Sequence, residues 1–249
     1  MNQDKYVKGM YWGSKDFSLT DLSNYRKYQF SLIKNYIGKN ILEVGSGDRG
    51  FTQLLVNSFN DCERIISIEP SITLLSNYEG KYVFPDYVNF QCIDLFDMNV
   101  KDTGYFDTII FIHVLEHIEN DRNALNKAYE LLKKNGNVLI EVPALPFLYS
   151  PNDELLGHYR RYDKKTLRSI IDKDKYKILD IWYQDIFGVF GSLYYFKIKK
   201  IKLKSDTGVD LVKNQGKIYD KYLIPFQSLF ENFFRLPLGL SLTAVLKKI

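Results

Sequence analysis

Five short apolar runs of strand length recur in the first part of the chain, at 41–44, 64–69, 88–92, 105–112 and 137–142. Between them, apolar residues recur at helical spacing, most clearly over 121–132, where Ala124, Leu125 and Ala128 share one face. Runs without polar alternation indicate strands that are buried on both faces. The alternation of the two patterns therefore predicts a parallel sheet with helices on both sides.

The pattern changes after residue 142. A long polar and aromatic loop over 143–162 precedes a helix over 164–171 and a strand over 176–183. The last apolar run, 241–249, is expected to pair beside 176–183 and so to fix the end of the chain. The predicted fold class is α/β, a doubly wound seven-stranded and mostly parallel sheet of Rossmann-like type, with an antiparallel terminal hairpin and an aromatic helical insertion.

These elements divide the chain into four parts. An N-terminal lid and helix take up 1–38, with a capping pattern at 18–21 and a helix end near Gly38. The ligand-binding core follows over 39–185, the insertion over 186–240, and the closing strand over 241–249. Tyr11 and Trp12 in the first part are interpreted as a lid over the ligand or as a strap on the core.

Composition narrows the class of protein. Hydrophobic residues make up 45% and charged residues 26%, which is typical of a soluble domain with a buried core. The net charge of +4 is too small to indicate nucleic acid. No apolar signal segment opens the chain, and the longest uncharged stretch of its last third, 186–196, is too short to span a bilayer. We expect a cytoplasmic protein.

The few cysteines and histidines also limit the chemistry. Cys62 and Cys92 have neither metal-binding nor redox spacing and are expected to be free thiols. With only three histidines besides, no metal site is expected.

The candidate chemistry is concentrated after the first strand, in a loop containing Gly45, Gly47 and Gly50. Glycine permits positive φ and lets a ligand approach the backbone closely. The helix predicted from Gly50 directs its N-terminal N–H groups toward the same crevice. Ligands of open parallel sheets bind at the carboxyl ends of the strands, so this loop predicts a ligand with polar or anionic groups.

Carboxylates follow or accompany three of the strands. Glu69 lies about 20 residues beyond the glycine loop, where a carboxylate can accept both hydroxyls of a ribose. Asp94 can accept from an exocyclic amine such as that of adenine. Glu43, just before the loop, disfavours a pyrophosphate and suits a cationic ammonium group. Glu69 and Asp94 also have a plainer interpretation, as a helix cap or a solvated strand end.

At these residues the sequence resembles the class I S-adenosylmethionine-dependent methyltransferases. The resemblance covers roughly residues 25–145, in family order, through the segments Leu42–Gly47, Ser67–Ser71, Cys92–Asp94, Phe106–His117 and Leu131–Val142. It implies S-adenosylmethionine as cofactor and S-adenosylhomocysteine as product. The cofactor-binding residues it implies, together with the acid before the loop, are Glu43, Gly45, Ser46, Gly47, Glu69, Pro70, Asp94, Leu95 and His113. Arg49 stands where many members have a third glycine.

Few side chains qualify as a general base for methyl transfer. His117 lies one helical turn beyond His113, and His158 lies within Gly157–Tyr162; both are candidate catalytic residues. The same segment supplies Tyr159, Arg160, Arg161 and Tyr162 as candidate acceptor-binding residues, because arginine suits phosphate and carboxylate partners. A packing role for His117 and a solvated basic turn at 157–162 remain open.

The stretch 142–162 further resembles a subgroup of these methyltransferases whose genes accompany polysaccharide or cell-envelope biosynthesis. This implies methyl transfer to an oxygen or nitrogen of a small acceptor bearing a sugar or phosphate. Alternatives are a lipid or quinone methyltransferase at a membrane surface, a nicotinamide-dependent oxidoreductase, and a non-catalytic cofactor-binding subunit. The aromatic and lysine-rich stretch 187–204 is interpreted as a solvated face, a peripheral membrane contact or a homodimer interface.

Overall fold

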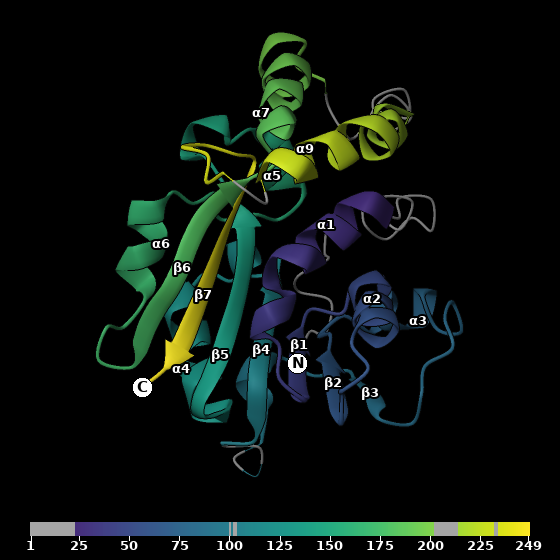
Figure 1. Ribbon diagram of the computed structural model, residues 1–249, viewed down its shortest axis with the longest axis vertical. Helices are drawn as coiled ribbons and strands as arrows, with labels where there is room; N and C mark the ends of the chain where they lie inside the picture. Colours follow the sequence, from purple (N-terminus) through teal and green to yellow (C-terminus); the bar gives the residue numbers. More distant parts are fainter. Residues whose placement is uncertain (1–22, 100, 102–103, 202–213, 232–233) are drawn as a thin grey trace.

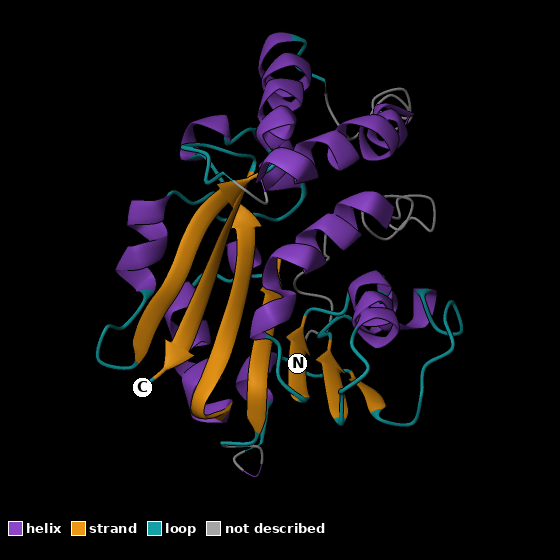
Figure 2. Ribbon diagram, in the orientation of Figure 1, coloured by secondary structure: helices purple, strands orange, loops and turns teal. Residues whose placement is uncertain are grey.

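The computed structural model describes residues 23–99, 101, 104–201, 214–231 and 234–249. Figures 1 and 2 show a central sheet with helices on both faces and a helical cap above the carboxyl ends of its parallel strands. The strand order is β3-β2-β1-β4-β5-β7-β6. The strands are β1 (Asn40–Val44), β2 (Arg64–Ile68), β3 (Val88–Gln91), β4 (Phe106–Ile112), β5 (Leu132–Pro143), β6 (Tyr176–Gln184) and β7 (Ser241–Lys248).

The helices fall into two groups. Those of the core are α1 (Ser23–Ile33), η3 (Lys34–Tyr36), α2 (Gly50–Ser58), α3 (Ile72–Asn77), η4 (Leu95–Asp97), η6 (Leu115–His117), α4 (Asp121–Leu131) and α6 (Lys164–Ile170). Those of the loop 143–162 and of the insertion are η7 (Pro146–Leu148), α5 (Pro151–Leu155), α7 (Ile186–Ser192), η8 (Leu193–Ile198), η9 (Tyr219–Leu223) and α9 (Ile224–Glu231). Within the described residues, no helix is both long and apolar enough to span a membrane.

The core has two layers because side chains of successive strand residues point to opposite faces of the sheet. Leu42 of β1 belongs to the layer that packs beneath α4, whereas the adjacent Ile41 belongs to the layer beneath α1 and α2. Both residues are fully buried. The strands are thus covered on both sides, and the predicted fold class is confirmed.

The C-terminal strand lies inside the sheet. β7 is antiparallel to β5 on one side and to β6 on the other, so the predicted pairing of 241–249 with 176–183 is confirmed. One boundary was wrong: the helix predicted over 121–132 does end at Leu131, but the strand expected over 137–142 begins already at Leu132. Leu132 is fully buried and pairs with Phe106, and this pairing draws the chain into the sheet early. The capping pattern at 18–21 and the expected lid at Tyr11 and Trp12 lie outside the described residues.

The insertion is joined to α1 through buried carboxylates. Asp220 of η9 accepts hydrogen bonds from the backbone N–H groups of Tyr25 (2.7 Å) and Asn24 (3.2 Å). Glu231 of α9 accepts from the N–H groups of Asp185 (2.8 Å) and Ile186 (3.0 Å). These contacts hold the insertion over the end of the sheet where the strands present their carboxyl ends (Figure 1).

Asp220→Ala is expected to lower the free energy of unfolding by about 1–3 kcal/mol, because two backbone donors lose a charged acceptor. Urea denaturation of the full chain measures the change. Asp61→Ala, at an exposed loop position, is the matched control and should leave stability within about 0.5 kcal/mol of the parent. Equal stability of the two variants would contradict a stabilising role for Asp220.

Candidate active site

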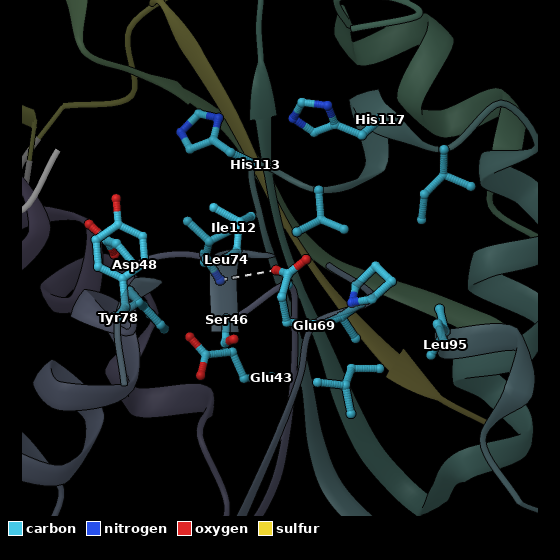
Figure 3. Close-up of a pocket in the computed structure, with 18 of the residues that line it drawn as sticks. Glu43, Ser46, Asp48, Glu69, Leu74, Tyr78, Leu95, Ile112, His113 and His117 are labelled. Atoms are coloured by element: carbon cyan, nitrogen blue, oxygen red, sulfur yellow. Dashed lines mark hydrogen bonds between the residues drawn. The ribbon is translucent and has the colours of Figure 1, made fainter. Parts of the chain in front are cut away.

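A cavity of about 280 Å³ opens at the carboxyl ends of β1, β2 and β4 (Figure 3). All nine residues predicted to bind the cofactor line this cavity, as does His117. The candidate residues Tyr159, Arg160, Arg161, Tyr162 and His158 do not line it. The structure therefore brings together the residues predicted to bind the cofactor, whereas His158 and the residues predicted to bind the acceptor lie outside the cavity lining.

The glycine loop has the backbone conformation that a close ligand requires. Gly45 has φ +80°, and a Cβ there would lie 2.6 Å from Cγ2 of Val114. Gly47 has φ +48°, and a Cβ there would have no atom within 4 Å, so its backbone faces open space. The N–H groups of Gly45 and Ser46 donate to the carbonyl oxygen of Ile68, at 2.8 and 3.0 Å, which anchors the loop to β2. The loop is therefore anchored to β2 where it begins, and its backbone is open to a ligand at Gly47.

Arg49 replaces glycine without changing the type of loop. Its φ of +62° is the left-handed conformation that glycine adopts readily, and it immediately precedes α2. Its Nη2 donates to the carbonyl oxygen of Leu75 at 2.9 Å, and its guanidinium lies 4.3 Å from the centre of the Phe90 ring. These contacts offset the cost of the left-handed backbone.

Glu69 connects the end of β2 to the glycine loop. Its Oε2 accepts from the N–H of Gly47 at 3.1 Å, and its Oε1 accepts from the N–H of Ser71 at 3.0 Å. The side chain is buried, and burial raises its pKa. Each carboxylate oxygen has two lone-pair sites, so both oxygens keep capacity for a further hydroxyl donor. Figure 3 shows the carboxylate at the centre of the cavity.

Glu43, in β1, is a second buried carboxylate that lines the cavity. Its Oε2 accepts from the hydroxyls of Thr52 (2.5 Å) and Ser67 (2.6 Å). Burial raises the pKa of Glu43 to about 7, against the lowering effect of these hydroxyls and of Arg26. A carboxyl group with this pKa changes its charge near neutral pH.

Asp94 begins the short helix η4 at the end of the β3 region. Its Oδ1 accepts from the N–H of Phe96 at 3.1 Å, which is the capping role that the plainer interpretation gave it. It lines the cavity all the same, beside the buried Leu95. Capping and ligand binding are compatible because a carboxylate has several acceptor sites.

His113 follows β4 with φ +54°, an unusual conformation for a residue other than glycine. Its Nε2 lies 3.2 Å from Oε1 of Glu141, and its Nδ1 lies 3.5 Å from Oε1 of Glu116. Burial lowers the pKa of His113, but the two carboxylates outweigh it and raise the pKa to about 10. His113 is therefore a cation at the cavity wall at neutral pH.

His117 and His158 face each other with ring centres 4.8 Å apart. Burial lowers the pKa of His117 to about 4, so this imidazole is neutral. Nδ1 of His158 lies 3.0 Å from Oδ1 of the buried Asp153. Within the described chain, Glu116, His117 and His158 each offer a ligand atom within 4.8 Å of the others, so they could hold a metal ion.

The structure corrects the acceptor-binding interpretation of the basic turn. Arg161 donates from Nε to Oδ1 of Asp153 at 2.7 Å, and Arg160 donates from Nη1 to Oδ2 of Asp121 at 2.6 Å. Tyr162 is 1% exposed, and its hydroxyl donates to the same Asp121 carboxylate at 2.8 Å. Buried carboxylates thus take up the donors of these side chains, and Tyr162 cannot contact an acceptor. Tyr159 remains, at 54% exposed.

Several cavity residues were not predicted from the sequence. Tyr25, Arg26 and Gln29 of α1 line the cavity, as do Leu74 and Tyr78 of the α3 region. Arg26 forms an ion pair with Asp48 of the glycine loop at 3.0 Å, and Nε2 of Gln29 donates to Oε1 of Glu141 at 2.5 Å. The spacing of the polar residues 25, 26 and 29, which places them on one face of a helix, could have indicated that α1 contributes to the cavity. The apolar residues interleaved with them favoured a face buried in the core.

The residues present fit an adenosyl sulfonium ligand. Ser46 has a buried Oγ without a hydrogen-bond partner in the described structure, and it lines the cavity. The free space over Gly47 leaves room for a ligand against the backbone. Carboxylates at 43, 69 and 94 line the same cavity. These features match a ligand with an ammonium group, vicinal hydroxyls and an amine.

Comparison with known proteins agrees with this geometry. Residues 23–190 match the family model of the methyltransferase domain. No curated protein matches the chain. Similar solved structures include a SAM-dependent methyltransferase from Archaeoglobus fulgidus, at 17% identity and a TM-score of 0.57, covering 92% of this chain and 94% of that one.

Two further similar structures contain bound S-adenosylhomocysteine. Coclaurine N-methyltransferase, also bound to N-methylheliamine, is 16% identical with a TM-score of 0.59, covering 94% of this chain and 75% of that one. The N-methyltransferase NodS from Bradyrhizobium japonicum WM9 is 14% identical with a TM-score of 0.50, covering 67% and 80%. Because the family model matches well over half of the sequence, the chain belongs to the methyltransferase-domain family, with the fold of the class I S-adenosylmethionine-dependent enzymes.

Proposed function

We propose that this protein transfers a methyl group from S-adenosylmethionine to an oxygen or nitrogen atom of a small acceptor, in the cytoplasm. S-adenosylmethionine is the cofactor and S-adenosylhomocysteine the product. The observation that carries the proposal is Glu69, which is held between the N–H groups of Gly47 and Ser71 in the centre of the cavity. A carboxylate in this position can accept both hydroxyls of a ribose.

The other groups of the cavity have complementary roles. Glu43 is assigned to the ammonium group, and the backbone of Gly45 to Gly47 to the methionine part. Asp94 is assigned to the adenine amine, with Pro70 and Leu95 as its apolar surroundings, and His113 to the methionine side. The cofactor supplies a methyl group that is already activated on a sulfonium, so the protein mainly has to position the reactants and exclude water.

The acceptor is proposed to enter from the side of loop 143–162. His117 lines the cavity, His158 packs against it with ring centres 4.8 Å apart, and the next residue, Tyr159, is exposed. His117 is neutral at pH 7, so it has a lone pair that can accept a proton from a hydroxyl, although its lowered pKa makes it a weak base. The resemblance of residues 142–162 to methyltransferases of polysaccharide and envelope biosynthesis supports an acceptor that carries a sugar or a phosphate.

Ligand-dependent stability tests the proposal. S-adenosylhomocysteine should raise the melting temperature of the full chain, and NAD should not, because only a ligand that binds the native state stabilises it. A screen of phosphorylated sugars and amines for methyl transfer then seeks the acceptor. Stabilisation by NAD alone would favour an oxidoreductase. Binding of S-adenosylhomocysteine without transfer to any acceptor class would favour a non-catalytic subunit.

Affinity for S-adenosylhomocysteine is expected to rise with pH between 6 and 8. The pKa of Glu43 is about 7, so its carboxylate is mostly protonated at pH 6 and mostly charged at pH 8, and only the charged form attracts an ammonium group. The expected gain is up to about tenfold, measured by calorimetry. Glu43→Gln should abolish this dependence. The same slope in the variant and the parent would contradict the assignment of Glu43.

Exposed side chains of the insertion favour a second candidate function at a membrane surface. Its exposed apolar residues include Phe190, Tyr194, Ile198, Ile218, Tyr222, Leu223, Phe226, Leu229 and Phe230. Lys197, Lys199 and Lys200 are exposed beside them. Apolar and cationic groups on one region suit anionic lipid, and this would fit a lipid or quinone acceptor.

Flotation with vesicles tests this candidate. We expect the chain to float with vesicles that contain phosphatidylserine and to remain in solution with phosphatidylcholine alone. Replacing Phe190, Phe226 and Leu229 with serine should reduce flotation several-fold, because insertion depends on buried apolar area. Val83→Ser, at an exposed apolar position far from the insertion, is the control. A concentration-dependent dimer that the serine variant loses would instead indicate a homodimer interface.

A further inference from the structure

Glu116 is a fully buried carboxylate that lacks hydrogen bonds. It is 0% exposed, and neither Oε1 nor Oε2 has a hydrogen-bond partner within the described part of the chain. The nearest cationic group is His113, whose Nδ1 lies 3.5 Å from Oε1. A buried carboxylate without donors strongly destabilises a fold unless a cation lies against it.

His117, the next residue, has a nitrogen in the same situation. Its Nδ1 is buried and without a hydrogen-bond partner among the described residues. A hydrogen bond joins the ring to the backbone of Gly157. When the other ring nitrogen carries the proton, Nδ1 has a free lone pair and can act as a metal ligand.

His158 completes a three-ligand cluster. Its Nδ1 is held by Asp153 at 3.0 Å, so its Nε2 is the nitrogen left for a ligand. Asp153 is fixed in turn by the N–H and hydroxyl of Ser150, both at 3.0 Å, and by Arg161 at 2.7 Å. A carboxylate that orients a histidine from behind is the usual support of a metal-binding imidazole.

Backbone contacts bring the two parts of the cluster together. The N–H of Tyr159 donates to the carbonyl oxygen of Glu116 at 2.8 Å, and the Tyr162 hydroxyl donates to that of Leu115 at 3.3 Å. The turn containing His158 is thereby docked on the short helix containing Glu116 and His117. One ligand atom from each residue lies within 4.8 Å of the others.

We propose that Glu116, His117 and His158 bind a divalent cation of the zinc type at the rim of the cofactor cavity. Two imidazoles and one carboxylate are a ligand set of catalytic zinc sites, which leave a coordination position open. Tetrahedral ligands lie about 3.4 Å apart, so binding would draw the three side chains together by roughly 1 Å. No metal was predicted from the sequence because the chain has only three histidines and two cysteines, and His158 is distant in sequence from Glu116 and His117.

The role of this cation in catalysis rests on the proposed methyl transfer. Since His117 also lines the cofactor cavity, an ion bound to it would lie beside the place where the acceptor must meet the methyl group. A hydroxyl oxygen bound to that ion loses its proton more readily. In the metal-bound form His117 is a ligand and no longer the base, so the proton passes to solvent. The oxygen–carbon bond forms, and the electron pair of the broken carbon–sulfur bond stays on sulfur. The site thus favours a hydroxyl acceptor over an amine.

Metal binding is measured on the full chain after treatment with chelator and dialysis. We expect calorimetry with Zn²⁺ to give one ion per chain, and Co²⁺ to give visible d–d absorption of a site with nitrogen ligands. Glu116→Gln and His158→Gln should each weaken binding at least tenfold and reduce the Co²⁺ absorption. Glu154→Gln, the same change at an exposed position in α5, should bind as the parent does.

Asp153→Asn tests the positioning role of the carboxylate behind His158. Binding of Zn²⁺ should fall about 10- to 100-fold, with both direct ligands still present. If a variant fails to fold, the titrations of the parent chain still decide the matter. Absence of stoichiometric binding by the parent, or undiminished binding by both Glu116→Gln and His158→Gln, would overturn the metal site and leave the His113 imidazolium as the partner of Glu116.

Binding of S-adenosylhomocysteine to the metal-free chain separates this proposal from the proposed function. Binding without a metal site would retain the methyltransferase and remove only the cation. A metal site without S-adenosylhomocysteine binding would retain the cation site and contradict the proposed methyltransferase function. Methyl transfer to a hydroxyl acceptor that falls after chelation and returns with Zn²⁺ would support both.

Discussion

Glu69→Ala should weaken the binding of S-adenosylhomocysteine by about 100-fold. Hydrogen bonds from two ribose hydroxyls to a charged acceptor contribute roughly 3 kcal/mol together, and 1.4 kcal/mol corresponds to a factor of ten. The substitution also removes the acceptor of the Gly47 N–H and so loosens the glycine loop. Calorimetry measures the change in affinity.

Two further variants sharpen this test. Glu79→Ala is the control. It changes an exposed glutamate just after α3 and should leave the affinity for S-adenosylhomocysteine unchanged. Glu69→Gln should lose affinity as well, because its amide nitrogen would face the N–H of either Gly47 or Ser71, donor against donor. Near-parental affinity in Glu69→Ala would mean that the ribose lies elsewhere.

Arg161→Ala should lower the free energy of unfolding by about 3 kcal/mol, because it leaves the Asp153 carboxylate, 1% exposed, without its guanidinium partner. His158 and Ser150 still contact that carboxylate and limit the loss. Chemical denaturation measures this effect. Arg168→Ala, at an exposed position of α6, is the control and should have little effect.

The same variant separates the two interpretations of the basic turn. A residue that grips the acceptor would raise KM and leave stability unchanged, whereas a residue that neutralises Asp153 lowers stability first. Arg161→Ala with parental stability and a raised KM would restore the acceptor-binding role. The expected result is the opposite, because the guanidinium is directed at Asp153 and at the carbonyl oxygen of Ala144.

Much of the fold could be predicted from the sequence because its signals are local. A strand that is covered on both faces needs consecutive apolar residues, as in the buried run Ile65 to Ile68. Such a run can be recognised in the sequence without knowing its place in the sheet. The boundary between α4 and β5 was less predictable. It depends on the pairing of Leu132 with Phe106, a partner distant in sequence. The hydrogen bonds from the start of α1 to Asp220 were unpredictable for the same reason, because the partners are far apart in the sequence.

The cofactor half of the site was predictable for a related reason. Gly45, Glu69 and Asp94 each follow a strand, and parallel strands present their carboxyl ends at one edge of a sheet. Local position in the sequence therefore fixed their position in space. The contribution of α1, through Arg26 and Gln29, was missed because a helix that covers a sheet can present polar groups to a cavity or apolar groups to the core.

By itself the sequence determined the order of strands and helices, the glycine loop and the acids that surround it, because these follow from local periodicity and from the geometry of parallel sheets. Only the tertiary structure decided which charged side chains can contact a ligand and which are paired with other residues of the protein. It turned Arg160 and Arg161 toward Asp121 and Asp153, and it brought His158 to Glu116 and His117. The physical reason is that a buried charge must find a partner, and that partner is set by packing between segments far apart in the chain.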